Sequence, residues 1–152
     1  MGMAHTSPES GTRARRAYAQ LAGTGARRTI ARQLVLDALD ENGGHRSAAD
    51  IHDLIVGRAP AVTLSTVYRT LSTLTEHGLV HTLTRGGEVH YGFADAPHHH
   101  GVCTGCGTTT EIPAEMVADL VDRLQRAAGL TLAPDGITLA GLCPACAAST
   151  RL

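Results

Sequence analysis

The chain has 152 residues, of which 43% are apolar and 18% are charged. This is enough apolar material to bury a core in one large domain or two small ones. The 13 basic and 14 acidic side chains leave a formal net charge of -1, which excludes a wholly basic nucleic-acid coat protein and an acidic disordered tail. No apolar run of about eighteen residues and no signal peptide are present, so we expect a cytoplasmic protein with no membrane partner.

Residues 1–28 are rich in Gly, Ser, Thr, Ala and Arg and lack a convincing apolar stripe. We therefore expect a mobile basic arm. A local excess of arginine extends to residue 32 and could contact phosphates, although a run of charge is more often only solvated surface. The candidate DNA-binding residues of this region are Arg27, Arg28 and Arg32.

Three short helices are expected next, because apolar residues recur every three or four positions over residues 29–42, 47–57 and 63–78. Ser47 is a good N-cap for the second helix, and Gly78 ends the third. The third helix has one apolar face, and its other side is polar. The candidate DNA-binding residues on this polar side are Ser65, Thr66, Tyr68, Arg69 and Ser72.

Two β-like segments, residues 79–85 and 88–93, are joined by Gly86-Gly87, a dipeptide typical of a tight hairpin turn. Three helices followed by a hairpin predict a winged helix-turn-helix over residues 29–94, whose third helix enters the major groove of DNA. The alternative is a helical bundle whose polar face only meets solvent. The adjoining wing and basic arm favour DNA binding.

A hinge is expected at residues 95–97, because Pro97 cannot continue a strand ladder. Residues 98–152 then predict a small α/β dimerisation and metal-binding domain, with an amphipathic helix that begins at Pro113 and ends at Gly129. The predicted fold class is therefore α+β. A unit of about 55 residues has a marginal core, so it needs a metal or a partner subunit.

Four cysteines form two CxxC pairs, and this spacing is typical of a tetrahedral zinc site: Cys103, Cys106, Cys143 and Cys146. In a reducing compartment the pattern favours structural Zn²⁺ over two disulfides. A site closed by four thiolates leaves no open position for water, and the signatures of zinc deaminases are missing. We therefore expect no enzyme and no catalytic residues.

Histidines gather around the expected hinge. In an extended segment, His98 and His100 face one side. Imidazole and carboxylate ligands suit Zn²⁺, Fe²⁺ and Ni²⁺, so these residue types leave the metal open. Further candidate ligands from the wing, from the loop between the first two helices and from the end of a predicted strand are His81, His90, His45 and Glu111.

Together these motifs resemble the ferric uptake regulator family, from about Thr29 to Cys146. The resemblance is carried by TIARQLVL at 29–36, TVYRTL at 66–71, HHHGVC at 98–103 and the closing CxxC pair. It implies a homodimeric repressor on palindromic operator DNA, a structural zinc on the four cysteines, and a regulatory metal at the hinge. RSAADIHD at 46–53 and GLVH at 78–81 are most similar to the zinc uptake branch, which implies zinc sensing and control of metal-uptake genes.

The resemblance implies two alternative sets of hinge ligands. His81, His98 and His100 match zinc-sensing members. His45, His98, His100 and Glu111 match iron and peroxide sensors. Both sets are present in this sequence.

Two departures from the family pattern leave the ligand set incomplete: Gly92 stands where iron and peroxide sensors have a carboxylate, and Ala94 where zinc sensors often have a cysteine. We hypothesise that His90, on the same strand face, fills the gap. A site of His81, His90, His98 and His100 favours Zn²⁺, or Ni²⁺, over Fe²⁺. A hypothesis of another class is a zinc-stapled interaction module that stores metal on its histidines.

Overall fold

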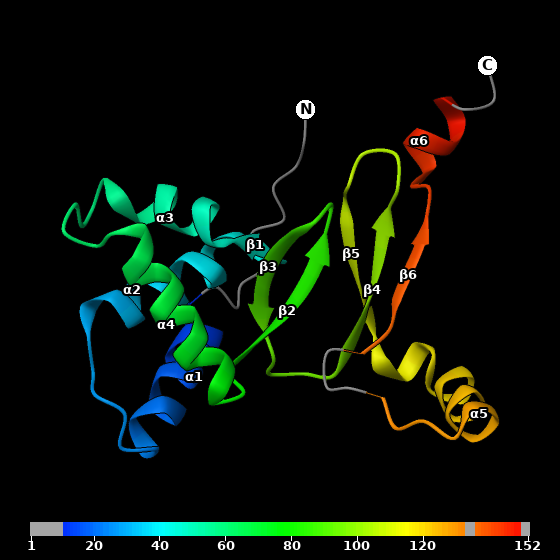
Figure 1. Cartoon of the computed structure of the whole chain (residues 1–152), viewed down its shortest axis with the longest axis horizontal. Coiled ribbons are helices and arrows are strands. Elements are labelled where there is room, and N and C mark those ends of the chain that lie inside the picture. The colour runs from blue at the N-terminus through cyan, green and yellow to red at the C-terminus, as the bar shows by residue number, and fades with distance from the viewer. Residues whose placement is uncertain (1–10, 133–135, 150–152) are drawn as a thin grey trace.

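The computed structural model describes residues 11–132 and 136–149 (Figure 1). The N-terminal half consists of α1 (Thr12–Gly23), α2 (Ile30–Asn42), β1 (Arg46–Ser47), α3 (Ala48–Val56), α4 (Leu64–Glu76), β2 (Val80–Arg85) and β3 (Glu88–Phe93). The C-terminal half consists of β4 (His98–Cys103), β5 (Thr109–Pro113), a short 3-10 helix (Ala114–Met116), α5 (Ala118–Ala128), β6 (Thr138–Gly141) and α6 (Pro144–Ser149). None of the helices described is long and apolar enough to cross a membrane.

The predicted winged helix-turn-helix is confirmed. The hydroxyls of Thr29, Ser47 and Thr63 cap α2, α3 and α4 by accepting a backbone N–H from three residues further on. Strands β2 and β3 pair antiparallel across Gly86-Gly87, and both glycines have positive φ, as the tight turn requires. The two residues of β1 add a third strand, which the sequence did not reveal, in the order β1-β3-β2.

The core of this half lies between its helices and the wing. The side chains with no exposed surface include most of the predicted apolar stripes: Val35, Ala38, Ile51, Ile55, Val67, Leu71 and Leu74. Three other apolar residues of the same helices, Ile30, Leu54 and Leu64, are exposed. Ile30 and Leu64 are the first residues of α2 and α4, where a side chain points beyond the packed turns.

The prediction of a mobile arm is wrong for residues 12–23, which form α1 and pack on α2. The buried side chains of α1 are Ala14, Ala17 and Leu21. The carboxylate of Asp40 on α2 accepts the backbone N–H groups of Gly11 and Ala14 at 2.8 and 2.9 Å, which fixes the start of the helix. Residues 1–10 of the expected arm lie outside the described residues.

The C-terminal sheet has the order β5-β4-β6, with β4 antiparallel to β5 and parallel to β6. The helix expected from Pro113 begins later, because Pro113 still pairs with His98 as the last residue of β5. A 3-10 turn follows, and α5 ends at Gly129 in the left-handed conformation, as predicted. Helix α6 was not predicted.

No side chain of α5, β6 or α6 is buried in the described part of the chain. Cys103 is the single buried apolar residue between β4 and α6 among those described. The C-terminal half therefore has too little core to be stable by packing alone.

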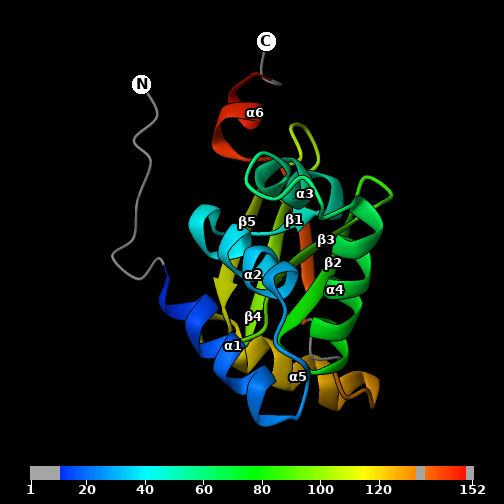
Figure 2. The same ribbon diagram turned by 90° about the vertical axis from the view of Figure 1, so that its left-hand side faces the viewer.

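Residues 94–97 connect the two halves, and α1 is fastened to this connection. The Arg13 guanidinium donates two hydrogen bonds to the Asp95 carboxylate, at 2.8 and 2.6 Å, and also lies 4.9 Å from the centre of the Phe93 ring. Figure 2 views the molecule from the side of the N-terminal half, with α1 to α4 in front of the strands. The helices thus cover one side of the molecule, and the C-terminal sheet lies beside the wing.

Candidate metal centres and nucleic-acid interface

The four cysteines lie where β4 and β6 end. Cys103 ends β4, and Cys106 lies in the following turn. Cys143 directly precedes α6, and Cys146 lies within it. All four are free thiols whose sulfur atoms lie within 4.8 Å of one another. The Cys106 and Cys143 sulfurs are 3.8 Å apart, and sulfurs about 2.3 Å from a tetrahedral zinc ion would be separated by about 3.8 Å. The cluster therefore fits Zn²⁺.

The backbone around the cysteines favours a thiolate. Hydrogen bonds from the backbone N–H groups of Cys143 and Cys106 lower the pKa of Cys103 to about 6. Contacts with the other three sulfurs, that of Cys143 foremost, raise the pKa of Cys146 to about 12. Negative charge that is concentrated on closely spaced sulfurs calls for a cation among them. At Gly105 a side chain would come within 3.0 Å of the Cys146 sulfur, so this glycine allows the two CxxC turns to meet.

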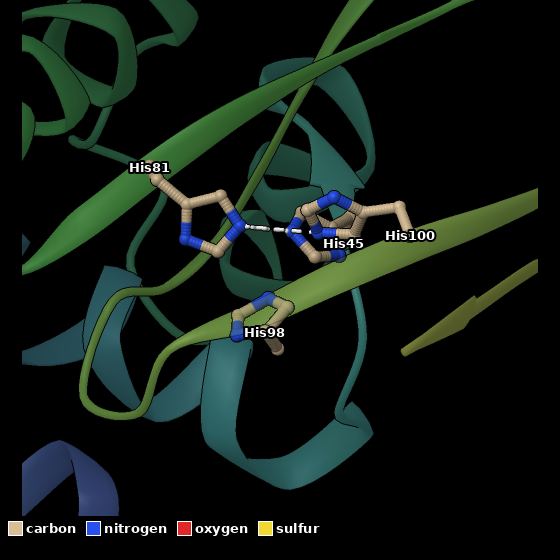
Figure 3. Close-up of side chains that lie close together, drawn as sticks. All are labelled: His45, His81, His98 and His100. Atoms are coloured by element: carbon tan, nitrogen blue, oxygen red, sulfur yellow. Dashed lines mark hydrogen bonds between the residues drawn. The ribbon is translucent and has the colours of Figure 1, made fainter. Parts of the chain in front are cut away.

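The second cluster consists of histidines from both halves of the molecule: His45, His81, His98 and His100 (Figure 3). His98 and His100 alternate along β4 and so share a face. His81 on β2 is paired with Gly92 on β3. Arg46 of β1 pairs with Tyr91 of β3, so His45, the residue before β1, lies opposite Gly92 on the side of β3 away from β2. Two imidazoles therefore flank a glycine.

Gly92 is the reason that His45 fits. A Cβ atom at position 92 would lie 2.6 Å from Nε2 of His45, which is far inside normal contact distance. The missing side chain leaves a space over β3, and the His45 ring fills it. Nε2 of His45 thereby comes within 2.7 Å of Nε2 of His81.

The spacing of the imidazoles fits a metal ion. The Nε2 atoms of His81 and His100 lie 3.3 Å apart, and nitrogens about 2.0 to 2.1 Å from a tetrahedral ion would be separated by about 3.4 Å. Nδ1 of His98 donates to the carbonyl oxygen of Ala96 at 2.8 Å, so the lone pair of this ring is on Nε2. That Nε2 is buried with no hydrogen-bond partner, as a metal ligand would be.

Its surroundings keep the His45 ring neutral. Burial, followed by the neighbouring histidines, lowers the pKa of His45 to about 3. Nδ1 of His45 lies 4.0 Å from Oε1 of Glu111, which is the cross-strand partner of His100. Glu111 is thus outside the group of four, and its carboxylate lies too far from His45 for a hydrogen bond.

The side chains of α4 that are predicted to contact DNA lie at its surface. Tyr68 is 52% exposed, and Arg69, Ser65 and Ser72 are exposed as well. Thr66 is only half-exposed, because its hydroxyl lies 3.0 Å from that of the capping residue Thr63.

The three predicted arginines lie between α1 and the first turn of α2. The Arg28 guanidinium lies 4.9 Å from the centre of the Tyr18 ring, and Arg32 donates to the carbonyl oxygen of Arg27. These contacts order the loop before α2, so the arginines belong to a folded surface.

Comparison with known proteins places this arrangement in a family. A model described as "Ferric uptake regulator family" matches residues 23–139. The chain belongs to the ferric uptake regulator family. It is 31% identical over 128 residues to the zinc uptake regulation protein of Mycobacterium tuberculosis, across 83% of this chain and 98% of the relative. It is 30% identical over 139 residues to the ferric uptake regulation protein of Bacillus subtilis, across 84% and 89%.

Solved structures of the family share the fold. A zinc uptake regulator complexed with zinc and DNA matches with a TM-score of 0.69 and 28% identity, over 96% of this chain and all of that one. Both sequence and structure therefore relate this chain to ferric uptake regulator proteins over nearly its whole length.

The hypothesis that His90 fills the gap in the hinge ligand set is wrong. His90 does not join the cluster: its Nε2 lies 3.0 Å from Nη2 of Arg85, and its Nδ1 lies 3.2 Å from the carbonyl oxygen of Glu88. His90 shares the strand face of Gly92, as predicted. Its partner on β2 is Leu83, which is two residues beyond His81, the partner of Gly92. His45 takes the place that His90 was expected to fill.

Proposed function

We propose that this protein is a metal-responsive transcriptional repressor that senses zinc and controls genes of metal uptake. The observation that carries the proposal is the origin of the four histidines. His45 and His81 belong to the winged half, whereas His98 and His100 belong to β4 beyond the connection. An ion held by all four histidines would fix the orientation of the DNA-reading half relative to the C-terminal half. The protein would act in the cytoplasm, where operator DNA lies.

The donor set favours zinc among the candidate metals. Four imidazole nitrogens within 4.8 Å of one another suit Zn²⁺, whereas Ni²⁺ prefers square-planar or octahedral sites and Fe²⁺ sites commonly include a carboxylate. Glu111 beside His45 supports the alternative of an iron or peroxide sensor, since a rotation of its exposed side chain would add an oxygen ligand. Nickel remains the second alternative.

The C-terminal half supports a homodimer. Its exposed apolar side chains include Met116, Leu120, Leu124, Leu130, Leu139 and Leu142. Burying them against a second copy would supply the core that the single chain lacks, while zinc on the cysteines holds the end of the sheet. A two-fold axis would present two α4 helices to a palindromic operator, about 34 Å apart.

Metal binding would act by shifting a population. If the free protein samples many orientations of its halves, a switch from about 1:99 to 99:1 needs about 5.5 kcal/mol of preference for the closed form. Ligands from both halves provide this preference because only the closed form assembles them. In that form Tyr68 and Arg69 would reach base edges and phosphates.

The test is DNA binding titrated against metal. A random-sequence duplex library is first enriched with the protein and Zn²⁺, and affinity for the selected duplex is then measured with Zn²⁺, Ni²⁺ and, without oxygen, Fe²⁺. We expect half-saturation at the lowest free concentration with Zn²⁺. His81→Ala should abolish the metal response, whereas His77→Ala, an exposed histidine at the end of α4, should preserve it. DNA binding that ignores added metal would refute the repressor and favour the storage module.

A further inference from the structure

A single arginine joins the tip of the wing to the turn that holds the first cysteine pair. Arg85 is the last residue of β2. Its Nη1 donates to the carbonyl oxygen of Gly107 at 2.8 Å and to the hydroxyl of Thr109 at 3.2 Å. Figure 1 shows the β2–β3 turn and the β4–β5 turn at the upper ends of these strands, and residues 94–97 at the lower end. The guanidinium thus bridges the halves far from their covalent connection.

The turn that accepts Arg85 is built on the cysteines. Gly107 donates its N–H to the carbonyl oxygen of Cys103 at 2.8 Å, and Cys103 donates to the carbonyl oxygen of Thr108 at 2.9 Å. The Cys106 sulfur lies 3.1 Å from the Thr108 hydroxyl. Gly107 has a φ of 74°, which a residue with a side chain would rarely adopt. The position of the acceptor carbonyl therefore depends on how Cys103 and Cys106 are held.

His90 aims the guanidinium. Arginine can only donate, so Nε2 of His90 must accept from Arg85, and Nδ1 then donates to the carbonyl oxygen of Glu88. His90 is only 3% exposed, so its ring has little freedom to move away from Arg85. Three acceptors from two segments, the β4–β5 hairpin and β3, hold one planar group, and such geometry is specific to arginine.

We propose that Arg85 couples the cysteine site to the orientation of the wing. The orientation of the wing then depends on the cysteine site as well as on the histidine site. The cysteine site also stabilises the C-terminal half. When its metal is lost, the turn at Gly107 is no longer constrained and the wing tip is released. The consequence for DNA affinity rests on the proposed function, whereas the release of the wing does not.

Hydrogen exchange of the wing amides tests this directly. With both sites loaded with Zn²⁺, we expect exchange over residues 80–93 to be about tenfold faster in Arg85→Ala, because a charged hydrogen-bonded anchor is lost. Thr109→Val, which removes one acceptor without changing charge, should give a smaller increase. Thr110→Val is the matched control, since Thr110 is the exposed neighbour on the other face of β5. Wild-type exchange in both Arg85→Ala and Thr109→Val would overturn the proposal.

The coupling itself is tested with Cys146→Ser, which weakens metal binding at the thiolate site. This variant should accelerate wing exchange in the wild-type background and add little in the Arg85→Ala background. Equal acceleration in both backgrounds would show that the cysteine site does not act through Arg85. A positive result together with DNA binding that ignores metal would leave the coupling intact and refute the proposed function instead.

Discussion

Replacing Gly92 with alanine should remove His45 from the histidine cluster without changing any ligand. The new Cβ would lie 2.6 Å from Nε2, 2.7 Å from Cδ2 and 2.9 Å from Cε1 of His45. Ordinary contact begins at 3.4 Å, so the ring would have to move by at least about 0.8 Å. Metal–ligand distances tolerate only about 0.2 Å, so His45 would no longer bind.

The loss of zinc affinity in Gly92→Ala should equal that caused by removing one of the four ligands. We expect the affinity of the hinge site for Zn²⁺ to fall about 100-fold, or about 2.7 kcal/mol. The assay is competition with a chromophoric zinc chelator, using protein whose thiolate site is already loaded. Gly101→Ala is the matched control, because position 101 also lies in a strand and its nearest neighbour would be 3.7 Å away. This control should keep the wild-type affinity.

A double-mutant cycle separates steric exclusion from general damage. His45→Ala should weaken binding as much as Gly92→Ala does. The double variant should be no weaker than either single one, since the clash disappears with the imidazole. If Gly92→Ala binds zinc within about threefold of wild type, or if the two losses add, the assignment of His45 as a ligand through Gly92 is refuted.

Three further predictions concern residues around the sites. His90→Ala should leave zinc affinity at the hinge unchanged in the chelator assay, and a tenfold loss would restore it as a ligand. Ser47→Ala should cost about 1 kcal/mol in urea unfolding, because it removes the cap of α3, whereas the exposed Ser65→Ala should stay within about 0.5 kcal/mol. Cys106→Ser should reduce bound zinc by one ion per chain and lower the Tm of the C-terminal half, since no buried side chains of α5, β6 or α6 support it. A full complement of zinc in this variant would contradict the thiolate assignment.

The parts of the molecule with local signals could be predicted. The helix caps, the Gly86-Gly87 turn and the paired CxxC motifs each need only neighbouring residues, and the structure has them as expected. The alternation of His98 and His100 also follows from strand geometry alone. Local rules therefore gave half of the histidine cluster and all of the cysteine cluster.

Helix α1 could not be recognised because its apolar stripe is weak. Two of its three buried positions are alanines, and the other nine residues include three arginines. The helix depends on Asp40 of α2 and on the pairing of Arg13 with Asp95, which are distant in sequence. A segment whose composition predicts a mobile arm thus forms a helix because residues distant in the sequence pack against it.

The choice between His45 and His90 depended on register, which the sequence does not encode locally. His90 shares a face of β3 with Gly92, and the His45 ring lies over Gly92, but β1 is only two residues long and has no pattern of its own. The signal that could have decided it is Gly92, a glycine inside a strand between Tyr91 and Phe93. Such a glycine marks a place where another group approaches closely. Here that group is the His45 ring, and the missing side chain at position 92 allows the fourth imidazole to enter the cluster.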